Sequence, residues 1–494
     1  MSALLDLVRG CTFDDVLFAP HYGVLERRDP SAIDLSCRLS EHLTLQRPIV
    51  SANMDTITRA EMAIAVAEEG GIGIIDRGFR SGDIEPQVRE VLRVKRRQHG
   101  IIVDPYTIRP EAPLTEAEEV MGRTGVGTLV VVDETRRVAG LLTTRDLRFA
   151  GRRGTVADRM TPRERLVQRE GDIDSEAAEA VMRTEKVKKL PLVDRDGRLI
   201  GLVTAKDLLK QKQLPFATRD AQGRLRVGGA IGAKGDYLER AAELLRAGAD
   251  VIVIDIAHGH SVVMARAVEA FRTQFGDAEL VAGNVATADG VRFLLERGVN
   301  GIKVGIGPGG GCTTRLNTNF GVPQVAALVE CREAAGGRLP LIADGGVKRH
   351  GALVQALMFG GDTVMLGSVL AGTLETPGDI VQKPVVIPES NKTVTVPFKV
   401  FRGMASLQAI VDRLDVEDAE SADVEALGAE GMEIAVPARG SVRPILRDML
   451  KHLCSAISYG GARSLSELQE MFRKDPHRYV IRLTESSRRE SFDR

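Results

Sequence analysis

Eight short apolar runs with helical segments between them constrain the fold of this chain more than any other feature. Most of the runs are apolar on both faces, and the segments between them, such as residues 237–247 and 289–297, carry apolar residues at helical spacing. Strands buried on both faces and joined through helices form parallel sheets, and eight such units are what a (β/α)8 barrel requires. We therefore predict an α/β protein built on a (β/α)8 TIM barrel, with strands at residues 48–51, 72–76, 225–231, 251–255, 280–284, 301–304, 341–344 and 363–366.

About 150 residues separate the second and third runs, which is too many for a single connection. This insert contains an internal repeat, because VVDETRRVAGLLTTRDL (131–147) recurs as LVDRDGRLIGLVTAKDL (192–208). Each copy predicts a strand, a turn, a strand and a helix that opens near an aspartate. The sequence therefore predicts a first part of the barrel at 1–99, a repeated insert at 100–212, and a second part of the barrel with a C-terminal segment at 213–494.

Positive and negative charges nearly cancel, with 67 Lys and Arg against 68 Asp and Glu, so no global field favours nucleic acid or anionic lipid. The five cysteines are widely spaced and include no CxxC pair, which argues against a disulfide framework or a zinc site and for a reducing compartment. The N-terminus is too short and too charged for a signal peptide, and no run of about 20 apolar residues could span a membrane. We expect a cytoplasmic protein with neither membrane nor nucleic acid as a partner.

A cysteine ends a glycine-rich loop after the sixth run, in GIGPGGGCTT (305–314). The glycines permit backbone angles that other residues resist, and a cysteine on such a loop is well placed to act as a nucleophile. The alternative is a glycine-rich turn with an incidental cysteine. Because (β/α)8 barrels keep their active sites at the C-terminal ends of the strands, the position after strand six favours Cys312 as a nucleophile.

Two more glycine loops follow the seventh and eighth runs, ADGG (343–346) and MLGS (365–368). The loops after these two strands often bind phosphate in this fold. Backbone N–H groups and one hydroxyl could come from Gly345, Gly346, Gly367 and Ser368, and Asp344 suits the two hydroxyls of a ribose. Turn chemistry alone explains any one of these glycines, but three glycine loops on one rim predict a phosphorylated ligand.

Together these motifs resemble those of the IMP dehydrogenase/GMP reductase family, over essentially the whole chain. The similar stretches are TFDDVLFAP (12–20), SANMDTIT (51–58), EEGGIGII (68–75), DIAHGHS (255–261), GIGPGGGCTTR (305–315), ADGG, MLGSVLAG (365–372) and FRGM (401–404). The resemblance implies a purine nucleotide monophosphate as substrate, a nicotinamide cofactor, and a covalent thioimidate between Cys312 and purine C2. In this family the dehydrogenases oxidise IMP to XMP, whereas the reductases expel ammonia from GMP and use NADPH to give IMP.

The two reactions need different helper residues. The dehydrogenases activate water with an Arg-Tyr pair on a flap, but no tyrosine occurs between Tyr237 and Tyr459. The corresponding segment, 412–431, is acidic, and its only arginine, Arg413, has no Tyr-Phe-Gln after it. We expect the acidic residues to hold the charge of Arg413, so that hydrolysis by the usual flap is not open to this chain.

The reductase pair is present. Thr314 and Glu430 match the threonine and glutamate that handle protons in this family, and together they could protonate departing ammonia as a general acid. The alternative for Glu430 is a surface carboxylate in a loop. Asn53, in ANMD, also resembles the reductases.

The resemblance assigns the remaining barrel residues by position. On the substrate side these are Ser51, Asn53, Met54, Gly310, Asp344, Gly345, Gly346, Gly367, Ser368, Arg402, Gly403, Met404, Ala405 and Gly431. On the cofactor side they are Asp255, Ala257, His258, Gly259, Asn284, Gly305 and Gly307, while the carbonyls of Gly307, Gly309 and Cys312 match a monovalent-cation (K⁺) site of the dehydrogenases. Phe401 and Gly310 depart from the family, since they replace a tyrosine and a serine whose hydroxyls usually reach the phosphate.

The repeated insert resembles a tandem pair of CBS domains. This resemblance implies an adenine or guanine nucleotide as effector, with Thr143 and Asp146 in one copy and Thr204 and Asp207 in the other on the ribose. The alternative is that these residues only cap the following helices. Family members assemble as homotetramers, which nucleotides on the CBS pair can join into octamers.

The sequence therefore favours an NADPH-dependent GMP reductase of purine salvage, with NADH left open as the reductant. Two alternatives remain at this point. One is an IMP dehydrogenase with an unusual water-activating group, and the other is a nucleotide-sensing homologue with a degenerate site.

Overall fold

The computed structural model describes residues 3–97, 101–102, 105–148, 153–171, 173–387, 392–414 and 429–492. Two compact units divide the chain. The first comprises Met1–Lys95, Phe216–Asp220 and Leu225–Arg494, and the second comprises Arg96–Pro215 and Ala221–Arg224. We call the first the barrel unit and the second the insert unit.

A closed barrel of eight parallel strands forms the centre of the barrel unit, and it confirms the predicted fold class. The strands run in the order β14-β15-β16-β17-β18-β19-β4-β5, so that each barrel strand pairs with the next one along the chain. β5 pairs with β14 across the insert, and β19 closes the barrel on β4. Almost every residue on them is buried, as the apolar runs require. Their bounds are β4 (Ile49–Ser51), β5 (Ile72–Ile75), β14 (Val227–Ile231), β15 (Val251–Asp255), β16 (Leu280–Val285), β17 (Gly301–Val304), β18 (Leu341–Asp344) and β19 (Thr363–Leu366).

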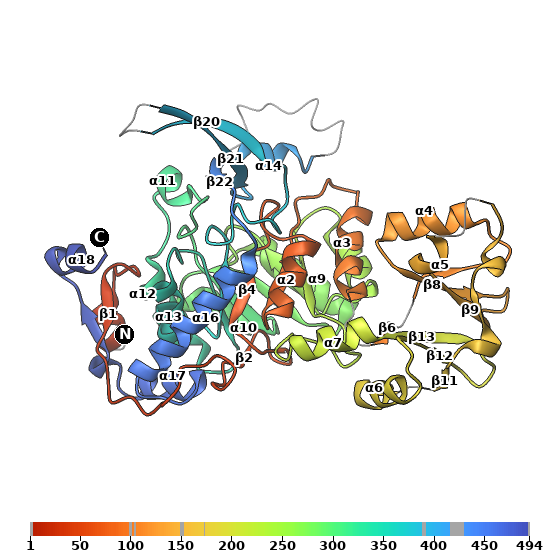
Figure 1. Cartoon of the computed structure of the whole chain (residues 1–494). Coiled ribbons are helices and arrows are strands. Elements are labelled where there is room, and N and C mark those ends of the chain that lie inside the picture. Colours follow the sequence, from red (N-terminus) through yellow and green to blue (C-terminus); the bar gives the residue numbers. More distant parts are fainter. Residues whose placement is uncertain are drawn as a thin grey trace. The chain divides into compact units, whose positions relative to one another are not determined.

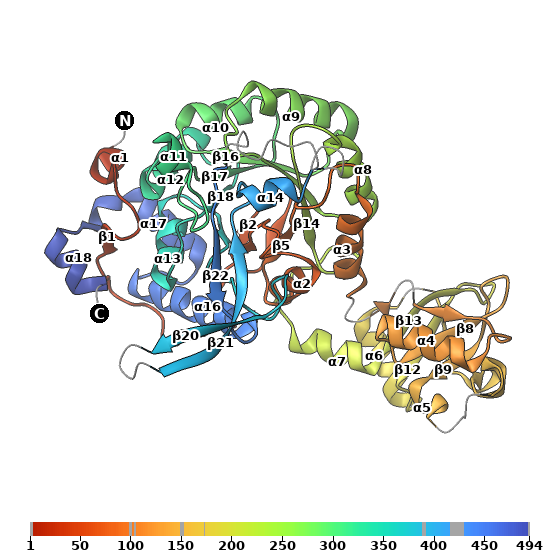
Figure 2. The ribbon, with the colours of Figure 1, turned by 90° about the horizontal axis from the view of Figure 1, so that it is seen from above.

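Helices surround these strands, as Figure 2 shows from one end of the barrel. Two of them are apolar almost all round, since eight of nine residues of α2 and eight of ten of α13 are buried. The long C-terminal helix α16 packs against both, which explains why neither has a polar face. The bounds of the surrounding helices are α2 (Ala60–Glu68), α3 (Glu85–Arg96), α8 (Tyr237–Arg246), α9 (Val262–Phe275), α10 (Ala288–Leu295), α12 (Gln324–Ala335), α13 (His350–Phe359) and α16 (Val442–Tyr459).

The two ends of the chain meet on one side of the barrel (Figures 1 and 2). β1 (Val16–Phe18) pairs antiparallel with β23 (Val480–Arg482). Beneath this ribbon the rings of Phe18, Phe359 and Phe472 form a cluster with centroids 5.3–5.7 Å apart. The cluster ties the N-terminal strand to α13 and to α17 (Leu465–Lys474). The remaining terminal elements are α1 (Ala3–Val8), β2 (Cys37–Arg38), β3 (Thr44–Leu45) and α18 (Glu485–Phe492).

A three-stranded sheet and two short helices lie together at one end of the barrel, at the top of Figure 1. The strands are β20 (Val381–Ile387), β21 (Lys392–Arg402) and β22 (Glu433–Pro437), with β21 in the middle. The helices are α11 (Thr314–Thr318), which follows the cysteine loop, and α14 (Leu407–Val411). These elements bring residues after 400 to the loops that follow β17 and β18.

Two similar halves make up the insert unit, as the sequence repeat predicts. Each half has a helix, α4 (Leu114–Thr124) or α6 (Ser175–Thr184), packed on an antiparallel strand pair, β8 (Thr128–Val132) with β9 (Val138–Thr143) or β12 (Lys189–Val193) with β13 (Leu199–Thr204). Apolar residues of both strand pairs share one further core cluster, including Val130, Leu141 and Leu202. Smaller elements complete the unit: β6 (Ile101–Ile102), β7 (Thr107–Ile108), α5 (Thr144–Leu147), β10 (Thr161–Pro162), β11 (Arg169–Glu170) and α7 (Ala205–Gln213).

All five cysteines are free thiols, in agreement with the absence of a disulfide pattern in the sequence. Among the described residues, every helix is too short or too polar to cross a bilayer.

Gly73 offers a test of the packing between β5 and α2. A Cβ at this position would lie 2.5 Å from the Cβ of Ala63, which no real pair of carbons tolerates. We expect Gly73→Ala to lower the free energy of unfolding of the barrel unit by about 1–3 kcal/mol, as overpacking does, in urea titrations. Gly351→Ala is the control, because nothing lies within 4 Å of its Cβ position on α13; equal losses in both variants would contradict the packing.

Candidate active site

A cavity of about 320 Å³ opens at the C-terminal ends of the barrel strands, a size typical of small-molecule sites. Loops after six of the eight strands reach it, and the segment after residue 400 closes one side. Twenty of the predicted site residues line it: Asn53, Met54, Asp255, Ala257, Asn284, Gly305, Gly307, Gly309, Gly310, Cys312, Thr314, Asp344, Gly345, Gly346, Gly367, Ser368, Gly403, Met404, Ala405 and Glu430.

A short relay of side chains connects the cysteine to the glutamate. The thiol of Cys312 lies 3.3 Å from Oγ1 of Thr314, and this hydroxyl donates to Oε2 of Glu430 at 2.6 Å. The last two residues are 116 positions apart in the sequence. The arrangement gives a proton a continuous path between the sulfur and the carboxylate, which is the geometry of an activated nucleophile with its base.

Backbone contacts hold this relay together. The segment 430–432 runs between the cysteine loop and the loop at 403–406: Thr313 N–H donates to Glu430 O at 2.8 Å, Met432 N–H to Gly311 O at 3.0 Å, and Gly403 N–H to Met432 O at 3.0 Å. Such close approach needs glycine. A Cβ at Gly311 would lie 2.9 Å from Gly403 N, and one at Gly431 2.6 Å from Ser406 N. The glycines therefore set the position of the glutamate relative to the sulfur.

The opposite rim carries the two predicted phosphate loops. Gly345 and Gly346 have φ of +91° and +83°, which glycine adopts without strain. Ser368 faces Gly310 across the rim, since a Cβ at Gly310 would lie 3.6 Å from its hydroxyl. Phe401 is 1% exposed. With no hydroxyl at positions 310 and 401, this rim offers an anion the Ser368 hydroxyl and backbone N–H groups.

A buried lysine joins two carboxylates on the floor of the cavity. Nζ of Lys303, whose side chain is 3% exposed, lies 2.8 Å from Asp255 and 2.6 Å from Asp344. Asn53 donates to Asp255 at 2.6 Å, and Asn284 donates to Asp344 at 2.8 Å. Burial opposes ionisation of Asp255, but Lys303 and Arg77 outweigh it and hold its pKa below the usual range. Burial likewise opposes the charge of Lys303, yet the two carboxylates raise its pKa. The charged lysine thus favours the ionised form of Asp255.

Arginines line the cavity beside Met404. Nη1 of Arg413 donates to Met404 O at 2.7 Å, and burial together with Arg77 lowers the pKa of Arg413 to about 10. Asp412 pairs with Arg402 instead, at 2.7 Å. The expectation that neighbouring acids hold the charge of Arg413 is therefore wrong for Asp412; residues 415–428 of that acidic segment lie outside the described part of the chain.

Five predicted residues do not line the cavity. Arg402 is held by Asp55 and Asp412 at 2.6 and 2.7 Å, which anchors the 400 loop. Ser51 is buried at the end of β4, and His258 is exposed beside His260. The other two act through their backbones: Gly259 N–H donates to Asn284 O, and Gly431 bridges Cys312.

Three positively charged residues line the cavity that sequence reasoning did not place there: Arg77, Lys303 and Arg413. Lys303 was hidden inside the apolar run of strand six, although a lone lysine in such a strand needs buried carboxylates and could have been noticed. Arg77 directly follows strand two, where barrel enzymes place functional groups.

The residues predicted to hold a monovalent cation have other contacts. Gly309 O accepts from Cys312 N–H at 3.1 Å. Arg315 packs against Gly307, and its Nε and Nη2 donate to Ile306 O at 3.2 and 3.1 Å. These contacts place a positive charge beside Gly307, and we derive no step through such an ion.

Barrel, cysteine relay and glycine rim together define a (β/α)8 barrel whose cavity, at the C-terminal ends of the strands, holds a thiol, a hydroxyl and a carboxylate in one chain of contacts. The chain belongs to the IMP dehydrogenase/GMP reductase family, whose domain matches residues 10–493. Its members are oxidoreductases that act on purine nucleotide monophosphates with a nicotinamide dinucleotide.

Relatives of both kinds resemble this chain. It is 41% identical over 486 residues to inosine-5'-monophosphate dehydrogenase of Aquifex aeolicus (strain VF5), covering 98% of this chain and 94% of that protein. It is 40% identical over 470 residues to that of Nitrosopumilus maritimus (strain SCM1), covering 94% and 95%. Among solved structures, a cysteine-to-alanine variant of GMP reductase from Trypanosoma brucei in complex with guanosine 5'-monophosphate has a TM-score of 0.88 and 37% identity, covering 98% of this chain and 97% of that chain.

Lys303 is expected to be a positioning residue. Lys303→Met leaves two carboxylates facing each other, and breaking a buried ion pair costs about 3–5 kcal/mol. We expect turnover to fall about 100-fold or more. The pH profile of turnover should also shift, because Asp255 becomes easier to protonate. Lys399→Met is the control, since this buried lysine donates to the carbonyls of Thr373, Leu374 and Thr376 and to the Thr376 hydroxyl. If the Lys303 variant is folded and turns over at the wild-type rate with an unchanged profile, the positioning role is wrong.

Asp76, at the end of β5, predicts a pH dependence of stability. Burial and the neighbouring Asp55 raise its pKa from 3.8 to about 6, against the pull of Arg59. The folded state therefore binds a proton that the unfolded state has lost between these two values, so this contribution is present below pH 4 and is lost as pH rises to 6. Between pH 7 and pH 5 the wild type should gain about 1 kcal/mol in unfolding free energy over Asp76→Asn. Glu61→Gln, an exposed carboxylate on α2, should show no such difference, and a constant gap for Asp76→Asn would contradict the raised pKa.

Proposed function

We propose that the chain is a GMP reductase, which converts GMP and NADPH to IMP, ammonia and NADP in purine salvage. The observation that carries the proposal is the relay from Cys312 through Thr314 to Glu430. A reductase must protonate a leaving amine at C2, and a carboxylate one hydroxyl away from the nucleophile suits that task. The absence of tyrosine between Tyr237 and Tyr459 supports the same choice, because the chain then lacks the Arg-Tyr pair with which dehydrogenases activate water.

The relay explains the order of proton movements. Glu430 accepts the thiol proton of Cys312 through Thr314 as the sulfur forms its bond to C2 of GMP. The same carboxyl then returns the proton to the 2-amino group, and the C2–N bond breaks to release ammonia. The nicotinamide, when bound, supplies the hydride that ends the sequence at C2, and the C–S bond breaks to free the thiolate and IMP.

Different residues of the cavity would bind the phosphate, the ribose and the base of the nucleotide. Ser368 and the loops 345–346 and 367–368 would hold the 5′-phosphate. One carboxylate oxygen of Asp344 accepts from Lys303 and Asn284, which leaves the other for the ribose hydroxyls. The backbone of Met404 and Ala405 would meet the base above Met54. Ser51, Asn53, Gly310, Arg402, Gly403 and Gly431 support these groups.

Asp255 and Asn284 would hold the nicotinamide side of the cofactor, with Ala257, His258, Gly259, Gly305 and Gly307 around it. Oδ1 of Asn284 is buried with no partner among the described residues, so an amide or hydroxyl of a cofactor could satisfy it. NADPH rather than NADH is proposed because reduction is the reaction proposed.

The insert unit is proposed to be a CBS pair that binds an adenine or guanine nucleotide and regulates the barrel. Thr143 N–H and Oγ1 donate to one oxygen of Asp146 at 2.8 and 2.7 Å in a capping box, so the capping role and a ribose contact by the second oxygen are compatible. Thr204 takes the matching place after β13, and the side chain of Asp207 lies outside the described part. A solved GMP reductase of Trypanosoma brucei, with a TM-score of 0.78 to this chain, is a complex with guanosine 5'-triphosphate. A cytoplasmic homotetramer that nucleotides join into octamers remains part of the proposal.

One observation favours the alternative, an IMP dehydrogenase that forms XMP and NADH. Arg413 lines the cavity with a pKa lowered to about 10, and an arginine of lowered pKa gives up its proton more readily, as a general base must before it can accept one. The curated relatives named above also carry that activity in their names.

Two assays with the pure full-length chain distinguish the functions by the absorbance of the reduced cofactor. Loss of NADPH with GMP supports the reductase. Formation of NADH with IMP and NAD would overturn it in favour of the dehydrogenase, and silence in both would favour a nucleotide-sensing homologue.

Variants of the relay test the mechanism. We expect Cys312→Ala to abolish turnover of GMP, and Thr314→Val and Glu430→Gln each to lower kcat by about 100-fold to 10,000-fold, the range of general acid-base catalysis. Glu433→Gln is the matched control, since this exposed glutamate lies three residues on, at the start of β22. A Glu430→Gln variant with wild-type kcat would exclude the relay as the proton path.

A further inference from the structure

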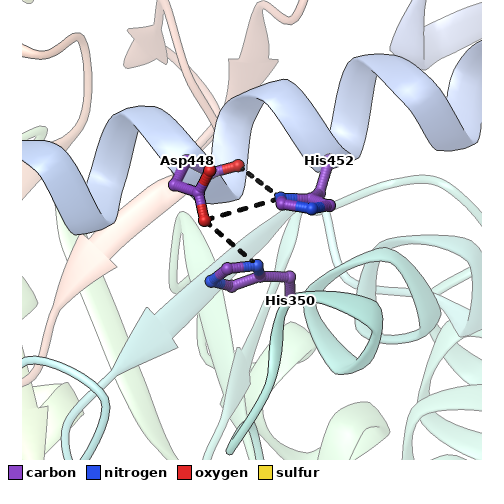
Figure 3. A group of neighbouring side chains, drawn as sticks. All are labelled: His350, Asp448 and His452. Carbon is purple, nitrogen blue, oxygen red and sulfur yellow. Dashed lines mark hydrogen bonds and ion pairs between the residues drawn. The ribbon is translucent and has the colours of Figure 1, made fainter.

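Two histidines and an aspartate meet where α13 packs against α16 (Figure 3). His350 is the first residue of α13, and Asp448 and His452 lie one turn apart on α16. One ligand atom from each of the three lies within 4.8 Å of the others. The two imidazole rings are 4.6 Å apart between centroids. None of the three lines the active-site cavity.

One hydrogen bond and one ion-pair contact orient the two imidazole rings of the cluster. Nδ1 of His452 lies 2.8 Å from the backbone carbonyl of Asp448, and Nδ1 of His350 lies 3.6 Å from the carboxylate of the same residue. A histidine that donates one N–H to a backbone carbonyl presents the other nitrogen as a ligand, which is how metal-bound histidines are oriented.

Basic side chains border the cluster in a groove of about 920 Å³. Two of them have their own acidic partners: Arg349 pairs with Asp14 at 3.0 Å, and Arg447 pairs with Glu69 at 2.6 Å. Lys348 and Lys451 are exposed on long side chains that can turn toward water. The groove is open, so water can complete the coordination of an ion.

We propose that His350, Asp448 and His452 form a binding site for a divalent transition-metal ion of the zinc class. Two imidazoles and one carboxylate suit Zn²⁺, Co²⁺ or Ni²⁺, whereas Mg²⁺ and Ca²⁺ prefer oxygen ligands alone. The ion links the start of α13 to the middle of α16. Because α13 follows the phosphate loop at 345–346, the ion fastens the helix behind that loop to the C-terminal helix.

The site is tested by titrating the metal-free full-length protein with Zn²⁺ in calorimetry. We expect one site per chain of micromolar affinity. His452→Ala and Asp448→Asn should each weaken binding at least tenfold and remove the rise in Tm that Zn²⁺ produces, as linkage requires. His477→Ala is the control, since it removes an exposed histidine of α17's C-terminal flank, and Mg²⁺ should give no heat.

Co²⁺ separates this site from binding to the free thiols. Nitrogen and oxygen ligands give only the weak visible bands of the ion, whereas a thiolate adds a strong near-ultraviolet band. Unchanged Zn²⁺ affinity in both variants, or a thiolate band in the wild type that accounts for all the bound cobalt, would overturn the proposal. Circular dichroism of the variants shows whether they are folded, and His350→Gln provides a third, independent substitution.

Discussion

The site depends on one close contact between three stretches of backbone. Gly311, Gly403 and Gly431 let the cysteine loop, the 403–406 loop and the segment 430–432 approach within hydrogen-bonding distance. Any side chain at these positions would separate the stretches. The sulfur of Cys312 and the carboxylate of Glu430 reach the same hydroxyl only because this contact fixes both of them.

A second constraint is electrostatic, and it comes from the barrel itself. Lys303 lies on β17 between Asp255 on β15 and Asp344 on β18, so one buried cation serves two carboxylates from two strand ends. Without it, two carboxylates would face each other with little access to water, which is costly. The ribose side and the cofactor side of the cavity therefore share one charge balance, which links the two halves of the proposed reaction.

Local patterns of apolar residues were enough to predict the strands and helices, because the burial of a strand and the spacing of a helix both show in consecutive residues. The eight barrel strands lie where the apolar runs place them, and each copy of the insert repeat forms the predicted pair of strands. Charged residues were harder to interpret. Lys303 lies in an apolar run, and its partners Asp255 and Asp344 are 48 and 41 positions away in the sequence. Arg413 was expected among acids, yet its neighbour Asp412 turns to Arg402, and the guanidinium of Arg413 binds Met404 O instead.

By itself, the sequence determined the barrel and the repeated insert, because each is encoded in short stretches whose pattern does not depend on distant residues. It also predicted, from motifs, Cys312 as a nucleophile with Thr314 and Glu430 as its partners. Only the tertiary structure decided which residues meet: that Thr314 joins Cys312 to Glu430 across 116 positions, that a lysine balances two carboxylates, and that His350 faces Asp448 and His452. The physical reason is that closing the barrel and returning the chain over its rim bring together groups whose distances along the sequence carry no information about their distances in space.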